Sequence, residues 1–191
     1  MELVFATHNK NKVIEVKSLI NQNINLLNLS DINFTDEINE TASTLEGNAI
    51  LKAQTIFNKT KFNCFADDSG LLVDALNGEP GVYSARYAGE QKNDEDNIVK
   101  ILKNLHGIEN RNAQFKTVLA LIINGNEYLF EGIMHGTITH EKMGAHGFGY
   151  DPIFMPHGYS KTFAELTLEE KSKISHRALA LNKMIKFINS I

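Results

Sequence analysis

Phe62-Asn63-Cys64-Phe65-Ala66-Asp67-Asp68-Ser69-Gly70 is the stretch around which the chain is organised. An apolar, aromatic run leads directly into two adjacent carboxylates, and Leu71-Leu72-Val73 follows the glycine. The pattern predicts a buried strand, an acidic tip, a tight turn and a second apolar segment. Because successive side chains of a strand point to opposite faces, Asp67 and Asp68 cannot both face one site while the chain stays extended.

The acidic pair has two interpretations. Adjacent carboxylates repel each other, so a fold that places them beside a buried strand normally supplies a cation or a proton to offset that cost. The alternative is a solvent-exposed acidic turn that has no chemical role. The stretch by itself leaves this choice open, and it leaves open which of the two carboxylates does the chemistry.

Length and composition indicate an ordinary soluble globular protein. The chain has 191 residues, 42% of them hydrophobic and 22% charged, with a net charge of -4, which suggests one domain or one domain with two lobes. No Lys/Arg cluster stands out, so duplex nucleic acid and anionic membranes are not favoured as partners. The single cysteine, Cys64, is flanked by Phe62 and Phe65, which indicates a packed thiol rather than a nucleophile.

The chain shows no sign of secretion or of membrane insertion. Its N-terminal residues, Met1 to Ala6, lack the basic start and the long apolar region of a signal peptide. No apolar run approaches the ~20 residues that span a bilayer. A cytoplasmic enzyme or binding protein therefore fits best.

A second polar stretch, Thr7-His8-Asn9-Lys10-Asn11-Lys12, follows the strand predicted over Leu3–Ala6. Apolar residues then recur at helical spacing, at Val13, Val16, Leu19 and Ile20. A helix that begins within or just after the stretch would offer its first-turn N–H groups and its dipole to a phosphate. Thr7 could add a hydroxyl, Asn9 an amide and Lys12 a charge. Alone this is a weak signal, because Thr and Asn are also ordinary helix caps.

A third stretch, residues 144–154, is rich in glycine and aromatic residues. Its three glycines let the backbone approach a ligand closely, Phe148 and Tyr150 offer flat faces, and the carboxylate of Asp151 can accept from N–H donors. A loop that binds a nucleobase is one interpretation. A glycine-rich connection that packs its aromatic rings inward is the other.

Periodicity and caps predict the remaining elements. They are a strand over 24–27, a helix begun by the capping box Ser43-Thr44-Leu45-Glu46, a helix capped by Asn93, strands over 115–123 and 127–134 joined at Asn124-Gly125-Asn126, a capping box at Thr167-Leu168-Glu169-Glu170 and a terminal helix after Ser175. Lys52 falls two turns into the second helix, where a surface role is the default. His176 and Arg177 fall in the first turn of the terminal helix, where cations oppose the dipole and so hint at a ligand.

Together these stretches supply what the hydrolysis of a nucleoside triphosphate requires: carboxylates for Mg²⁺ and for the attacking water, lysines for phosphate, and aromatic rings for a base. The sequence resembles the inosine/xanthosine triphosphate pyrophosphatases, which clear deaminated purine nucleotides from the nucleotide pool. The resemblance covers nearly the whole chain. It rests on six segments in family order: 7–12, 48–53, 66–71, 81–87, 147–154 and 170–177.

The resemblance implies an α/β fold with an elongated mixed β-sheet flanked by helices, and two lobes with a central cleft, formed by a single pyrophosphatase domain over residues 1–191. It implies a homodimer, dependence on Mg²⁺, and cleavage of ITP, dITP or XTP between the α and β phosphates. Asp68 is the implied general base and metal ligand, with Asp67 beside it and Glu40 as a second metal ligand. The implied substrate-binding residues are Thr7, His8, Asn9, Lys10, Asn11, Lys12 and Lys52 for the triphosphate, Ser69 for a further contact, and Phe148, Gly149, Tyr150, Asp151, Lys171, His176 and Arg177 for the base and phosphate pocket.

One segment departs from the family pattern. The family usually has Glu-Glu-Thr-Gly before the second helix and a Glu directly before the later Asn. Here the segment is Asn39-Glu40-Thr41-Ala42, and Gly47 precedes Asn48. Glu40 remains available to a metal ion, whereas Asn39 contributes no charge.

Two other functions remain compatible with these residues. One is a pyrophosphatase for modified pyrimidine nucleotides on a similar fold, and the other is a nucleotide-binding protein without catalytic activity. Rates on a panel of nucleotides would distinguish the pyrimidine-specific enzyme from the purine-specific one. Release of pyrophosphate from ITP with Mg²⁺ would exclude a binding protein without activity. A nucleic-acid-binding module is disfavoured by the acidic charge balance.

Overall fold

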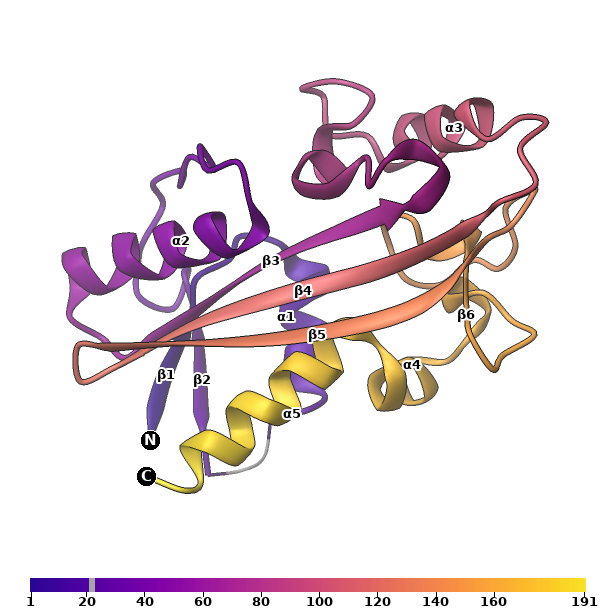
Figure 1. Ribbon diagram of the computed structural model, residues 1–191. Coiled ribbons are helices and arrows are strands. Elements are labelled where there is room, and N and C mark those ends of the chain that lie inside the picture. The colour runs from indigo at the N-terminus through magenta and orange to yellow at the C-terminus, as the bar shows by residue number, and fades with distance from the viewer. Residues whose placement is uncertain (21–22) are drawn as a thin grey trace. The chain divides into compact units, whose positions relative to one another are not determined.

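The computed structural model describes residues 1–20 and 23–191, which form a mixed sheet with helices beside it (Figure 1). Six strands lie in the order β2-β1-β3-β4-β5-β6; β1 is parallel to β2 and to β3, and β5 is antiparallel to β6. The mixed α/β sheet expected from the sequence is confirmed. The elements are β1 (Glu2–Phe5), α1 (Lys10–Lys17), β2 (Asn25–Asn28), α2 (Leu45–Thr60), β3 (Cys64–Val73), α3 (Asp94–Asn104), β4 (Asn112–Ile123), β5 (Asn126–Ile138), β6 (Phe154–Pro156), α4 (Leu168–Ile174) and α5 (His176–Ile188).

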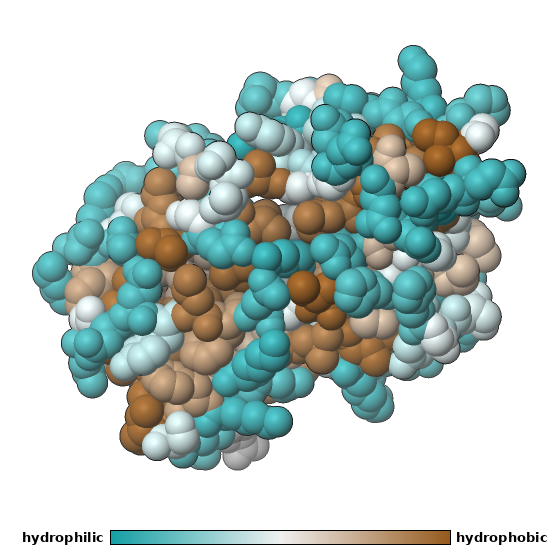
Figure 2. Space-filling view, viewed as in Figure 1, coloured by the Kyte–Doolittle hydropathy of each residue, from teal (hydrophilic) through white to brown (hydrophobic). Residues whose placement is uncertain are grey.

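The chain divides into two compact units. The first consists of Met1–Asp68, Thr117–Gly132 and Arg177–Ile191, and the second consists of Ser69–Lys116 and Ile133–His176. Each unit has a hydrophobic core of its own. Figure 2 shows mostly hydrophilic residues on the visible face, with hydrophobic side chains between them. The single domain with two lobes stays a prediction, and each unit is described separately below.

Strand β3 runs through the acidic pair without turning. It extends as one strand from Cys64 to Val73, so the tight turn expected after the pair is wrong. Gly70 lies within the strand. A Cβ atom at this position would overlap the carbonyl oxygen of Gly81, which explains why the strand has a glycine here. The N–H group of Leu71 also donates to Ser84 Oγ at 2.9 Å. A small residue is therefore needed for close packing here, although the same residue type usually indicates a turn.

The two faces of β3 in the first unit pack against different helices. Phe65 stacks on Phe5 of β1 with ring centroids 4.5 Å apart, in a core that includes residues of α1 and α5. The neighbouring Cys64 faces α2, where its thiol donates to the carbonyl oxygen of Ala53 at 3.3 Å. Cys64 is fully buried, as expected of a packed thiol, and burial raises its pKa to about 12. By the same alternation, the next acidic residues must also point to opposite faces.

Two predicted caps are confirmed: Asn93 caps α3, and Thr167 begins α4 with both hydrogen bonds of a capping box. Asn9 caps α1, which is the ordinary role that the sequence left open for this polar stretch. The predicted cap of α2 is wrong by one residue, because Thr44 rather than Ser43 is its cap. Thr44 Oγ1 accepts from the N–H group of Gly47 at 3.0 Å, so a glycine stands where a capping box has its Glu or Gln.

Candidate functional site

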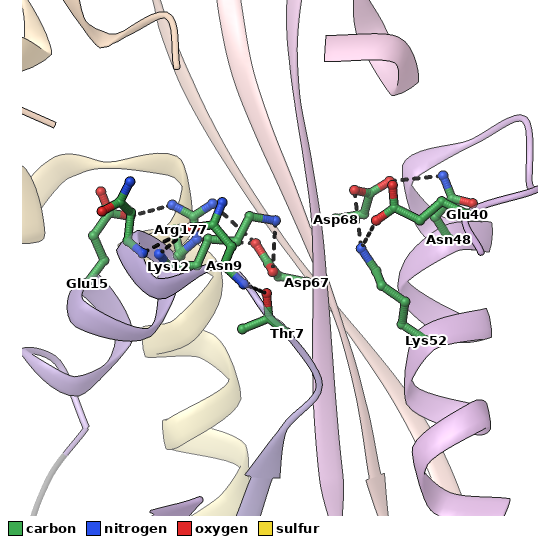
Figure 3. A network of polar contacts seen from close by, with 11 residues as sticks. Thr7, Asn9, Lys12, Glu15, Glu40, Asn48, Lys52, Asp67, Asp68 and Arg177 are labelled. Atoms are coloured by element: carbon green, nitrogen blue, oxygen red, sulfur yellow. Dashed lines mark hydrogen bonds and ion pairs between the residues drawn. The ribbon is translucent and has the colours of Figure 1, made fainter. Parts of the chain in front are cut away.

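Asp67 lies in a buried cluster of charges on the face of β3 that packs against α1 and α5 (Figure 3). Lys12 Nζ donates to Asp67 Oδ1 at 3.0 Å, and Arg177 donates to Asp67 Oδ2 through Nε and Nη2, both at 3.2 Å. Arg177 Nη1 also donates to Glu15 Oε2. The exposed fractions of Asp67 and Arg177 are only 1% and 2%. Two cations and two carboxylates therefore balance each other within this cluster.

This cluster holds Asp67 in its ionised form. Burial by itself would raise the pKa of Asp67, but the charges of Lys12 and Arg177 outweigh burial and hold the pKa well below its usual range. Burial lowers the pKa of Lys12, although Asp67 partly restores it. A carboxylate with so low a pKa is a poor proton acceptor near neutral pH. Asp67 is therefore suited to positioning Lys12 rather than to taking a proton.

Asp68 points to the opposite face of β3 and contacts α2 (Figure 3). Asn48 Nδ2 donates to Asp68 Oδ2 at 3.2 Å, and Lys52 Nζ donates to Asp68 Oδ1 at 3.4 Å. Lys52 Nζ also donates to Glu40 Oε1 at 2.5 Å. Asn48 and Lys52 are four residues apart, so they lie on one face of the helix. Two carboxylates thus meet around one ammonium group.

The pKa of Asp68 moves in the opposite direction from that of Asp67. Burial raises it, and the negative charges of Glu40 and Asp67 add to this effect, against the opposing charges of Lys52 and Lys12. The pKa of Lys52 is raised, because Asp68 and Glu40 outweigh its burial. Environments that move the pKa values of neighbouring carboxyl groups apart are suited to giving them different roles. Of the two, Asp68 is the carboxyl group whose pKa is raised.

The loop before α1 is already hydrogen-bonded within itself. Asn9 Oδ1 accepts from the N–H groups of Asn11 and Lys12 at 2.9 and 3.2 Å, and Thr7 Oγ1 accepts from the N–H group of Asn9 at 3.1 Å. The N–H groups that the sequence offered to a phosphate are thus partly used by the cap. Lys12, in the first turn of α1, is paired with Asp67, and the residues of this stretch that lie at the surface are His8, Asn9, Lys10 and Asn11.

In the second unit, two carboxylates fix the loop that carries Phe148. Asp151 Oδ2 accepts from the N–H group of Phe148 at 2.9 Å and from Lys171 Nζ at 2.6 Å. The N–H group of Gly149 donates to Asp94 Oδ2 at 2.7 Å. Lys171 Nζ lies 5.1 Å from the centre of the Phe148 ring. Phe148, Gly149, Asp151 and Lys171 therefore come together, with the aromatic ring held in a fixed loop.

The other predicted residues of the base pocket are placed differently. Tyr150 is buried in the second core and its hydroxyl group donates to the carbonyl oxygen of Ser84 at 2.8 Å, as in the inward-packing alternative. His176 is buried, with its ring stacked on Phe115 at 4.5 Å between centroids. Arg177 belongs to the first unit, in the Asp67 cluster. Ser69, which is half-buried, is the first residue of the second unit.

Comparison with known proteins identifies the family. The sequence model of the Ham1 family matches residues 3–187. The chain belongs to the Ham1 family. It is 56% identical to the dITP/XTP pyrophosphatase of Flavobacterium johnsoniae, over all of this chain and 99% of that one, and 49% identical to the dITP/XTP pyrophosphatase of Bacillus subtilis, over 99% and 98%.

Solved Ham1 structures have the same fold. The Ham1 protein of Staphylococcus aureus superposes with a TM-score of 0.90 at 41% identity, covering 100% of this chain and 99% of that one. A HAM1 protein from Coxiella burnetii gives a TM-score of 0.91 at 38% identity and covers 100% of both chains. The agreement extends over the full length, so both units described above belong to the Ham1 fold.

Sequence reasoning missed two buried residues of the charged clusters on either face of β3, Glu15 and Asn48. Both are buried polar residues on helices, and both follow an apolar helical pattern: Glu15 precedes the buried Val16, and Asn48 lies three residues after the buried Leu45. A polar residue on the buried face of a helix needs a polar partner, because burying it alone is costly. The position of Glu15 and Asn48 on the buried face of a helix could therefore have indicated that each has a polar partner.

Proposed function

We propose that this chain is a nucleoside triphosphate pyrophosphatase that hydrolyses the deaminated purine nucleotides ITP, dITP and XTP to the nucleoside monophosphate and pyrophosphate. This activity would remove these nucleotides before they are incorporated into DNA and RNA. The observation that carries the proposal is the pair Asp67 and Asp68 on opposite faces of β3, where Lys12 and Arg177 bind the first carboxylate and Asn48 and Lys52 bind the second. The activity named for the relatives, dITP/XTP pyrophosphatase, supports the choice of substrate.

In the proposed reaction Asp68 orients a water molecule toward the α-phosphorus and accepts a proton from it. The new P–O bond forms as the bond to the bridging oxygen breaks, and pyrophosphate leaves. Lys12 and Lys52 stabilise the charge that develops on pyrophosphate. Lys171, which the resemblance placed in the base and phosphate pocket, is paired with Asp151 beside Phe148, so we assign it to the base.

Glu40 and Asp68 fit a divalent cation, which we propose to be Mg²⁺. Their oxygens are the hard ligands that Mg²⁺ prefers, and the two carboxylates with Lys52 carry one net negative charge. Among the described residues, His, Cys, Asp and Glu form no group of three that could hold a metal ion. This is in keeping with a site that water and substrate phosphates complete. When bound, Mg²⁺ would neutralise phosphate charge and orient the phosphates.

For the base, we propose that Phe148 stacks on the ring while His176 donates to the 6-oxo group. Hypoxanthine and xanthine have a 6-oxo group, whereas adenine has a 6-amino group, which would leave a buried donor facing a donor. Such a mismatch costs on the order of 1–3 kcal/mol. Arg177 was expected in the same pocket, but its Nε, Nη1 and Nη2 atoms donate to Asp67 and Glu15, so we do not assign it to the base.

Replacing His176 with Phe should narrow the preference for ITP over ATP. Phe keeps an aromatic ring for stacking on Phe115 but has no donor, so the ratio of the two kcat/KM values should fall by about 5- to 150-fold. Steady-state rates of pyrophosphate release measure the ratio, with His176→Ala as a second variant. An unchanged ratio in both variants would move recognition of the base to other residues.

Pyrophosphate release across a nucleotide panel tests the proposed function as a whole. With Mg²⁺ present, we expect the highest kcat/KM on ITP, dITP and XTP, with one pyrophosphate released for each monophosphate. Faster turnover of modified pyrimidine nucleotides would favour the alternative pyrophosphatase. Tight binding of ITP without release of pyrophosphate would favour a non-catalytic nucleotide-binding protein.

Some expectations from the sequence stay predictions. They are the homodimer, the cytoplasmic location, and the lack of a nucleic-acid or membrane partner. No helix in residues 1–20 and 23–191 is both long enough and apolar enough to cross a membrane.

A further inference from the structure

Asn48 connects the loop that carries Glu40 to the carboxylate of Asp68. Its Oδ1 atom accepts from the N–H group of Ala42 at 2.9 Å, and its Nδ2 atom donates to Asp68 Oδ2 at 3.2 Å (Figure 3). The side chain is fully buried, with an exposed fraction of 0%. One amide group therefore joins two segments that lie 20 residues or more apart, through a contact on each of its two polar atoms.

The orientation of this amide follows from its partners. A backbone N–H group can only donate, so Asn48 must turn its oxygen toward Ala42, and its nitrogen then faces Asp68. A carboxylate can only accept, so this orientation satisfies both partners at once. Because Asn48 takes Asp68 Oδ2 while Lys52 takes Oδ1, the rotation of the Asp68 carboxylate is set by two groups on one face of α2.

Gly47 makes room for this connection. A Cβ atom built on Gly47 would lie 2.7 Å from the Cβ atom of Ala42 and 3.1 Å from Thr44 Oγ1. Gly47 is helical, so it serves here through its small size rather than through a special backbone conformation. A larger residue would push the loop away from the first turn of α2, and the N–H group of Ala42 would then lose Asn48.

We propose that Gly47 and Asn48 are positioning residues that fix where the carboxylates of Glu40 and Asp68 lie relative to each other. The proposal rests on the proposed function, since these two carboxylates are the ones assigned to the metal ion and to the water. Glu40 is only two residues before Ala42, so anchoring Ala42 to α2 restricts where the Glu40 carboxylate can lie. Lys52, one turn further along α2, then bonds to both carboxylates.

The first experiment exchanges the methyl group between helix and loop. We expect Gly47→Ala to lower kcat for ITP by about 10-fold or more with KM changed less than about 2-fold, and to weaken Mg²⁺ affinity by about 10-fold. The affinity is measured by calorimetry without nucleotide. Adding Ala42→Gly should restore both quantities to within about 3-fold of the wild type. Helix propensity alone would make Ala at position 47 stabilising, so a loss indicates the clash.

The second experiment removes the donor from Asn48. In Asn48→Asp the side chain keeps its shape and its acceptor for Ala42, but it places a carboxylate beside Asp68; we expect kcat to fall about 10- to 100-fold. The matched control is Asn58→Asp, at an exposed position of the same helix, which should match the wild type. Thermal melting of all variants shows whether each one folds.

The outcomes separate this proposal from the proposed function. If Gly47→Ala keeps the wild-type kcat and Mg²⁺ affinity, or if Ala42→Gly fails to restore them, the positioning role is wrong. The role is also wrong if Asn48→Asp behaves like Asn58→Asp. If the wild type releases no pyrophosphate from ITP, the proposed function fails. The calorimetric Mg²⁺ affinities of the variants still test whether Gly47 and Asn48 position the carboxylates of Glu40 and Asp68.

Discussion

Asp68→Asn should lower kcat for dITP by about 10²- to 10⁴-fold and leave the protein folded. The amide has the shape of the carboxylate but cannot accept a proton from water. The change also removes a carboxylate whose pKa is raised by burial and by the negative charges of Glu40 and Asp67, so the folded state loses an unfavourable charge. Lys52 retains Glu40 as its partner at 2.5 Å. The melting temperature should therefore equal or exceed that of the wild type.

The matched control for Asp68→Asn is Asp74→Asn. Asp74 is an exposed carboxylate, so its change alters the net charge equally but leaves the buried network intact. Its kcat should match that of the wild type. Pyrophosphate release measured over a range of Mg²⁺ concentrations checks that weaker metal binding does not account for the loss in Asp68→Asn. Turnover by Asp68→Asn close to the wild-type rate would reject Asp68 as the base.

The alternation of a strand was enough to predict that Asp67 and Asp68 serve opposite faces. That rule depends only on backbone geometry, which holds wherever the chain is extended. The predicted turn after them failed because turn prediction relies on residue type. Gly70 is small for packing against Gly81, and no local pattern in the sequence distinguishes this reason from a turn.

Burial of charged residues was the main feature that the sequence did not predict. Lys52 sits on a helix where a surface position is the default, yet it is buried because Glu40 and Asp68 lie beside it. Its partners come from segments 12 and 16 residues away, and only the folded chain brings them together. Charge pairs of this kind depend on tertiary structure, which explains why their residues were predicted as binding groups but their contacts were not.

The pair His176 and Arg177 shows the same limit. The resemblance to the pyrophosphatase family implied that both lie in the base and phosphate pocket. Consecutive residues of a helix point about 100° apart, so neighbours in sequence can enter different surroundings. In the structure His176 stacks on Phe115, whereas Arg177 donates to Glu15 and Asp67. The two residues therefore call for different experiments.

Arg177→Met should lower the free energy of unfolding by about 3–5 kcal/mol. The side chain of Met fills a similar volume but leaves Glu15 and Asp67 buried without the guanidinium group, and removing one partner of a buried ion pair typically costs this much. Lys12 still offsets part of the charge of Asp67 at 3.0 Å. Denaturant unfolding at pH 7 measures the loss. The free energy of unfolding of Arg177→Lys should lie between those of the wild type and Arg177→Met, because one ammonium group cannot reproduce the bonds of Nε, Nη1 and Nη2.

The control for Arg177→Met is Lys186→Met. Lys186 is an exposed cation on the same helix, so its change should alter the free energy of unfolding by less than about 0.5 kcal/mol.

The pH dependence of the free energy of unfolding is a further check on the pair of Arg177 and Asp67. The folded pKa of Asp67 lies below its ordinary value, since Lys12 and Arg177 outweigh the effect of burial, so its stabilisation is full above about pH 4 and is lost as the pH falls toward the folded pKa. Removing Arg177 brings the folded pKa back toward the ordinary value, so the stability difference between wild type and variant should shrink below pH 4. A variant as stable as Lys186→Met, with an altered ratio of ITP to ATP turnover, would instead place Arg177 at the base.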